Sequence, residues 1–112
     1  MALLIVQTES EDTIAAPGNR QSNYICVSVT DAAGNPVTGL TVKNFAVDPM
    51  IVGPGGALVN ITSAAPVRLP GTYIVQVVPI RTETWKAGVY IFATAVTQGA
   101  NHGQALCKVK MD

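Results

Sequence analysis

Apolar and polar residues alternate with a period of two along much of this chain. In residues 25–30 (ICVSVT), Ile25, Val27 and Val29 fall on one side and the more polar residues fall on the other. Successive side chains of a strand point to opposite faces of a sheet, so this pattern predicts a strand with one buried face. The sequence shows no stretch with the 3.6-residue period of an amphipathic helix. The pattern therefore predicts an all-β protein.

Turn-forming residues divide the chain into seven such runs. Residues 31–36 (DAAGNP), for example, combine an aspartate, a glycine and a proline, each of which favours a reversal of the chain. In the third run we expect a β-bulge near Lys43 and Asn44, because the apolar residues before and after this point fall on opposite faces. The spacing of the runs is typical of a β-sandwich. We predict strands over residues 2–8, 24–30, 40–48, 57–63, 71–78, 88–97 and 104–111.

Three of these stretches resemble a known family. Residues 27–47 (VSVTDAAGNPVTGLTVKNFAV) are similar to the signature of bacterial immunoglobulin-like domains, both of the invasin and intimin type and of modules that accompany von Willebrand type A domains. The stretches GTYIVQV (71–77) and AGVYIF (87–92) resemble the tyrosine-bearing strands of the same family. The resemblance covers most of residues 23–97. It implies an immunoglobulin-like Greek-key β-sandwich of about seven strands that serves in adhesion, spacing or docking.

The length and the charge of the chain limit the functions that it can have. The chain has 112 residues, which suits a single domain over residues 1–112 with a core of its own. Only 12% of its residues are charged and the formal net charge is zero, whereas a soluble domain usually has about 25% charged residues. Such a surface does not attract nucleic acid, and its low charge favours self-association.

The sixth predicted strand is apolar on both faces. The central part of this strand, residues 89–96, reads VYIFATAV. If one of its faces is buried, the other face is still apolar. By analogy with the tyrosine-bearing consensus, we expect Tyr90, Phe92 and Val96 to point inward. We then expect an interaction surface, for a protein partner or for self-association into a homo-oligomer, in which the outward residues lie beside the last strand: Val89, Ile91, Ala93, Ala95 and Leu106. The alternatives are an inverted facing or an N-terminal segment folded over this face.

A possible ligand-binding rim is the second candidate site. His102, the sole histidine, lies on the hairpin predicted between the last two strands. Loops of a sandwich alternate between its two ends, so His102 and Asn101 should lie at the same end as Asp31 and Asn35. These residues supply too few strong ligands for zinc or calcium, and we therefore expect neither a metal nor another cofactor.

Trp85 has two interpretations. With Arg81 and Glu83 nearby, its ring has the chemistry to stack on a sugar, which makes a carbohydrate- or peptide-binding module the alternative function. A large aromatic just before a strand also commonly closes the end of a sandwich core, and we favour this second interpretation.

The sequence offers little for catalysis. Ser28, Ser63 and Cys107 have only His102 as an imidazole base, and none of them lies in a nucleophile-elbow motif. The carboxylates show no spacing that would pair them for acid and base chemistry, and no glycine-rich loop precedes a helix. We therefore expect a protein that is not an enzyme.

The termini and cysteines bear on location. The opening MALLIV lacks the basic start of a signal peptide, and no apolar run reaches the length of a membrane helix. These features lead us to expect a cytoplasmic protein or a component of a released particle. Cys26 and Cys107 alternate with inward-facing residues in opposite senses, so one thiol should face out and the other in. This facing argues against a disulfide between them.

Overall fold

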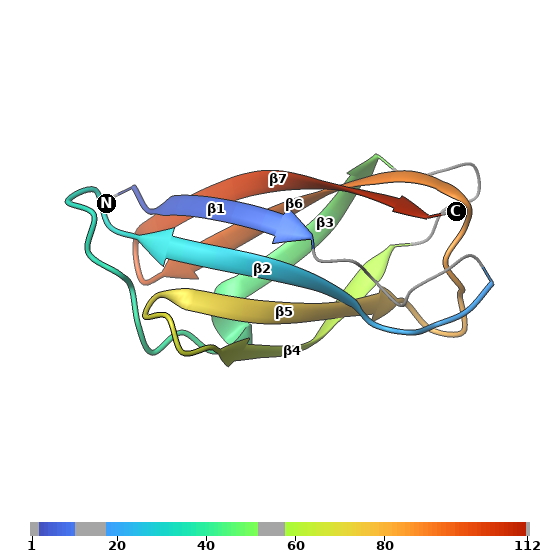
Figure 1. The fold of residues 1–112 in the computed structure, drawn as a ribbon, viewed down its shortest axis with the longest axis horizontal. Coiled ribbons are helices and arrows are strands. Elements are labelled where there is room, and N and C mark those ends of the chain that lie inside the picture. The colour runs from blue at the N-terminus through green and yellow to red at the C-terminus, as the bar shows by residue number, and fades with distance from the viewer. Residues whose placement is uncertain (1–2, 11–17, 52–57, 112) are drawn as a thin grey trace.

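The computed structural model describes residues 3–10, 18–51 and 58–111. Within these residues the chain forms β-strands and one short 3-10 turn, η1, and no α-helix (Figure 1). The elements, in chain order, are β1 (Ile5–Ser10), β2 (Asn23–Thr30), η1 (Val42–Asn44), β3 (Phe45–Ile51), β4 (Val59–Pro66), β5 (Thr72–Pro79), β6 (Gly88–Gln98) and β7 (Asn101–Met111).

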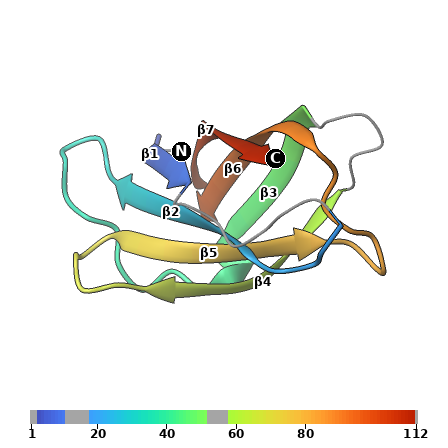
Figure 2. The same cartoon turned by 45° about the vertical axis from the view of Figure 1, so that its right-hand side comes forward.

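The strands build two antiparallel sheets that lie face to face. One sheet has the order β1-β2-β5-β4, and the other has the order β3-β6-β7. Figure 2 shows the two sheets as separate layers, with β5 and β2 in one and β6 and β3 in the other. The prediction of an all-β sandwich of about seven strands is therefore confirmed.

The core lies between the two layers and follows the alternation of the sequence. Ile25, Val27 and Val29 of β2 are fully buried, as expected, and Tyr90 and Phe92 of β6 oppose them from the other sheet. Burying a side chain of this size stabilises a fold by about 1.5–3 kcal/mol relative to leaving it exposed. The inward facing predicted for β6 is thus the observed one.

The third predicted strand is wrong in its first half. Residues 40–44 do not pair in a sheet: Val42 begins η1, and β3 starts only at Phe45. Asn44 stabilises this turn because its side-chain oxygen accepts the backbone N–H of Thr41 at 2.8 Å, while its Nδ2 donates to the carbonyl of Thr97 at 2.8 Å. The change of face is absorbed by a 3-10 turn and not by the expected bulge, so that Val42 is exposed.

Both outer edge strands are irregular. In β3 the pairing register shifts between Pro49 and Ile51, and in β4 it shifts between Ile61 and Ser63, three residues before the strand ends at Pro66. Proline has no N–H to offer a further strand, and a bulge twists an edge away from new partners. These edges are therefore poor templates for pairing with another chain.

β1 joins the two layers on the side away from β3 and β4. It pairs with β2 over its whole length, from Ile5 opposite Thr30 onward. On its other side the N–H of Leu4 donates to the carbonyl of His102 at 2.7 Å, and Thr8 Oγ1 donates to the carbonyl of Leu106 at 2.9 Å. We call this contact between β1 and β7 the seam. β1 lies at the edge of β7 (Figure 1), and Val89 on the outer face of β6 is exposed.

Gly103 makes the seam possible. A Cβ atom at this position would overlap the carbonyl group of Leu4 and approach Cγ2 of Val6 to 3.0 Å. Only glycine therefore allows the backbones of β1 and β7 to approach this closely.

Arg20 fastens the opposite end of the sandwich. Its guanidinium group donates to three carbonyls of the turn that follows β5: those of Pro79, at 3.0 Å, Ile80 and Glu83. Next to it, the N–H of Trp85 donates to the carbonyl of Asn19 at 2.9 Å. The segment before β2 is thereby tied to the segment between β5 and β6.

Candidate interaction surface

The outer face of the β3-β6-β7 sheet carries an apolar stripe along its central strand. The residues of β6 that alternate with the buried Tyr90 and Phe92 point to this face, and in β7 Leu106 lies directly opposite Ala93. We call the following five residues the stripe: Val89, Ile91, Ala93, Ala95 and Leu106.

Exposure varies along the stripe. Leu106 is 60% exposed and Val89 39%, Ile91 and Ala95 are half-buried, and Ala93 is only 8% exposed. Ala93 is small and lies between Asp48 of β3 and Leu106, whose longer side chains flank it. The outward facing holds for all five residues, but the centre of the stripe is less accessible than the alternation alone suggests.

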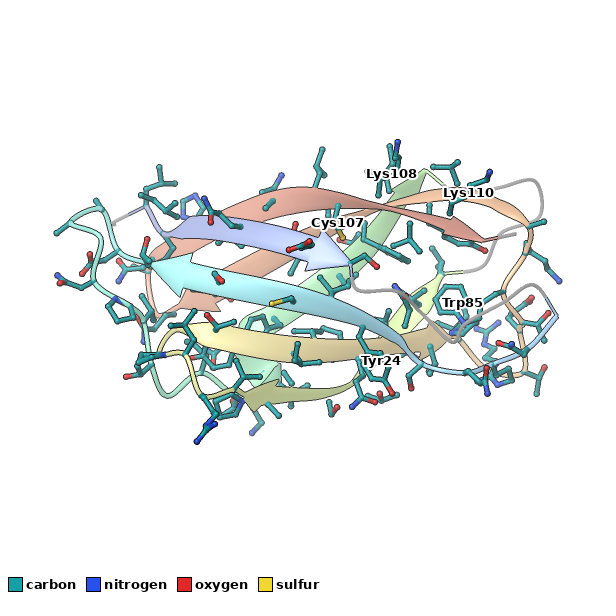
Figure 3. All side chains as sticks on the ribbon, viewed as in Figure 1. Tyr24, Trp85, Cys107, Lys108 and Lys110 are labelled. Atoms are coloured by element: carbon teal, nitrogen blue, oxygen red, sulfur yellow. The ribbon has the colours of Figure 1, made fainter. Side chains whose placement is uncertain are left out.

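Charged residues border the stripe on both sides. Asp48 lies on β3 in the same row as Ala93 and Leu106, and Lys108 lies on β7 opposite Ile91. Figure 3 shows Lys108 and Lys110 pointing away from the sandwich, whereas Cys107, the residue before Lys108, points to the interior. The surface is thus an apolar strip with an acidic group on one flank and basic groups on the other.

A shallow groove extends the apolar surface toward β1. It has a volume of about 730 Å³ and lies between the first residues of the chain that the structure describes and the ends of β6 and β7. Leu3, which is 63% exposed, and Ile5 contribute its apolar wall, and Ala95, His102 and Gln104 lie on the other side. The sequence signal for this extension is the run LLIV at residues 3–6, which is apolar on both faces as β6 is.

The predicted rim residues form two separate groups at one end of the sandwich. Asp31 and Asn35 lie in the loop after β2, while Asn101 and His102 begin β7. The start of β1 stands between them, because Ile5 pairs with Thr30 on one side and the chain bridges to His102 on the other. The expectation that these loops share one end is met, but the residues do not form one cluster.

Asp31 stabilises its own turn. Its Oδ1 accepts the backbone N–H groups of Ala33 and Asn35, both at 2.9 Å, and its Oδ2 accepts Nδ2 of Asn35 at 3.3 Å. The hydrogen bond from the Asn35 backbone is the main reason that the pKa of this carboxyl lies below its ordinary value. Since the carboxylate is occupied in this way, the geometry assigns Asp31 to the turn and not to a ligand.

Trp85 lies at the opposite end from the rim, so it cannot act with the other four residues (Figure 3). Trp85 is 1% exposed, and its Nε1 donates to the carbonyl of Gln21 at 2.7 Å. Its ring packs edge-on against those of Tyr90 and Phe92, with ring centroids 5.5 and 6.4 Å apart. The proposal that it stacks on a sugar is therefore wrong, because no ring face is open. Closure of the core is its role.

Cys26 and Cys107 are both reduced and are not joined by a disulfide. Cys26 is half-buried on the outer side of β2, whereas Cys107 is buried between the layers, as the facing argument predicted. Removal from water raises the pKa of the Cys107 thiol, which keeps it protonated and unreactive at neutral pH. The geometry thus does not give Cys107 the environment of a nucleophile.

Comparison with known proteins gives no information on the family or function of this chain. The chain matches no protein-family model, no curated protein and no solved structure. Over the described residues, no group of three or more His, Cys, Asp or Glu side chains is placed to hold a metal ion. In the same part of the chain, no helix is long and apolar enough to span a membrane.

Proposed function

We propose that this protein is a non-catalytic structural or docking module that works through protein–protein contacts, and that it self-associates through the stripe. The observation that carries the proposal is the outward apolar face of β6, from Val89 to Ala95, which no element of the described chain covers. Apolar surface that stays together on a folded protein commonly marks an interaction site.

Two further features support contact between faces. The edges of both sheets at β3 and β4 are interrupted by register shifts and end in or contain proline, so edge pairing is disfavoured. The low content of charged residues, 12%, with a net charge of zero leaves little long-range repulsion between copies of the chain.

We also propose that the module is immunoglobulin-like, as the sequence resemblance implies. The sheet orders β1-β2-β5-β4 and β3-β6-β7 correspond to the ABED and CFG sheets of constant-type immunoglobulin domains. Tyr90, near the start of β6, accepts the backbone N–H of Lys86 at 3.1 Å, which parallels the tyrosine corner of such domains. The chain departs from antibody domains in its cysteines, because Cys107 lies on β7 and not on β6.

Light scattering after size exclusion tests self-association. We expect the wild-type mass to exceed the 11.7 kDa of one chain as concentration rises. The variant Ile91→Asp places a carboxylate in the stripe and should return the mass to that of one chain, with an unchanged circular dichroism spectrum. Gln76→Asp is the matched control, because Gln76 is also half-buried but faces outward from the other sheet.

Two results would overturn the proposal. One is a wild-type chain that stays at 11.7 kDa at every concentration. The other is a mass that falls equally with Gln76→Asp and Ile91→Asp, since self-association would then not depend on the stripe.

A further inference from the structure

We propose that the stripe binds a second copy of this chain about a twofold axis parallel to β6, so that β3 of each copy lies over β7 of the other. This inference rests on the proposed function and adds the orientation of the partner. It follows from the unequal flanks of the stripe: Asp48 on the β3 side, Lys108 on the β7 side.

Symmetry limits the ways in which two identical faces can pack. A twofold interface uses the same patch on both copies, and for two stacked sheets the axis lies in the plane between them. An axis parallel to β6 exchanges the β3 and β7 sides, which brings the acidic flank of each copy against the basic flank of the other. An axis perpendicular to the strands through the row of Ala93 would instead set Asp48 against its own copy. Only the first arrangement is electrostatically complementary.

The rows of the sheet show that the charges can meet. Asp48, Ala93 and Leu106 form one row across the three strands. With the axis along β6, Asp48 of one copy therefore stands above Leu106 of the other. Lys108 lies two residues further along β7, about 7 Å away, and the four-carbon chain of a lysine spans such a distance. Each interface would contain this contact twice.

The area of the face explains why the flanks matter. β6 and β7 are each 11 residues long and β3 is 7, so the three strands present a surface of roughly 470 Å² per copy. Two copies would bury about 1,000 Å², which is the lower limit for a specific interface. The apolar stripe alone thus makes a weak contact, and complementary charges on its flanks select one orientation.

Charge reversal tests the orientation. We expect Asp48→Lys and Lys108→Asp each to weaken self-association about tenfold or more at low salt, because each change creates two like-charge contacts. The double variant Asp48→Lys/Lys108→Asp should regain most of the wild-type affinity, since the pairs are then opposite again. Dissociation constants are measured by sedimentation equilibrium in about 50 mM and 1 M salt, where screening should remove most of the difference.

Arg68→Asp provides the control for net charge. Arg68 is exposed on the β4–β5 hairpin, away from the stripe, and its reversal changes the net charge as much as Lys108→Asp does. This variant should associate like the wild type. Thermal melts of all variants should agree, because both reversed residues of the stripe flanks are exposed.

The outcomes separate this inference from the proposed function. If the wild type self-associates but neither single reversal weakens it, or the double variant is weaker than both single variants, the orientation is wrong and the stripe can still be the interface. If the wild type never exceeds the mass of one chain, the proposed function itself fails.

Discussion

The seam between β1 and β7 leads to a quantitative prediction for Gly103→Ala. The new methyl group would overlap the carbonyl group of Leu4, and the backbone cannot yield without moving β1 away from β7. Gly103 is not among the glycines with a positive φ, so alanine at this position does not force the backbone into the left-handed region. The whole effect should therefore come from the close approach of the two strands.

The magnitude follows from what the displacement breaks. In the described part of the chain, the hydrogen bonds of the seam include those from the N–H of Leu4 and from Oγ1 of Thr8, each contributing about 0.5–1.5 kcal/mol. Partial exposure of the buried Leu4 side chain costs about 1 kcal/mol more. We expect a loss of roughly 2–4 kcal/mol in the free energy of unfolding, which corresponds to a fall in Tm of about 8–16 °C for a domain of this size.

Thermal denaturation and amide hydrogen exchange provide the assay. Gly99→Ala is the control, because Gly99 has a φ of 61° but no atom within 4 Å of the added Cβ. Backbone strain alone should cost it about 1 kcal/mol, or about 4 °C. In Gly103→Ala the Leu4 amide should also lose its protection from exchange. A Gly103→Ala protein that melts no lower than the control and keeps this amide protected would refute the close contact of β1 and β7.

Two further predictions concern polar groups. In Arg20→Lys, a single ammonium group cannot reach the three carbonyls that the guanidinium group binds. We therefore expect the free energy of unfolding, measured in urea, to fall by about 1–2 kcal/mol. A loss below about 0.3 kcal/mol would contradict this role of Arg20. For Asp31, a pKa lowered by folding means that its contribution to stability is complete above the ordinary carboxyl pKa of about 3.9 and is lost as pH falls through the lower folded value. An NMR titration should give Asp31 a pKa below the ordinary carboxyl value, and the Asn35 amide should lose its protection from hydrogen exchange in the same pH range. A pKa of about 3.9 or higher for Asp31 would contradict the turn geometry.

The layers of the sandwich could be predicted from the sequence because burial is decided locally. In β2 and β6, most inward positions hold large apolar residues, such as Val27 and Phe92, and alternation with period two assigns the facing of their neighbours. Asn23 and Thr94 are the buried polar exceptions in these two strands. The outward facing of the stripe follows from the same rule. Its charged flank could not be predicted, because the row that joins Asp48 to the stripe depends on the register between β3 and β6.

The remaining errors concern contacts between distant parts of the chain. The 3-10 turn at Val42 depends on the bond from Asn44 to the carbonyl of Thr97, which lies on another strand. Alternation of loops between two ends correctly placed Asp31 and His102 at one end, but it does not reveal that β1 passes between them. Trp85 illustrates the opposite case, since the position of a large aromatic before a strand favoured its burial from the start.

The irregular edges of β3 and β4 bear on how such a chain stays in solution. A protein with 12% charged residues has little electrostatic defence against growth into cross-β fibrils, which extend by adding strands to a free edge. Here that defence is built into the backbone, through register shifts close to Pro49 and Pro66. We therefore expect two copies that meet through the stripe to do so without adding strands to these edges.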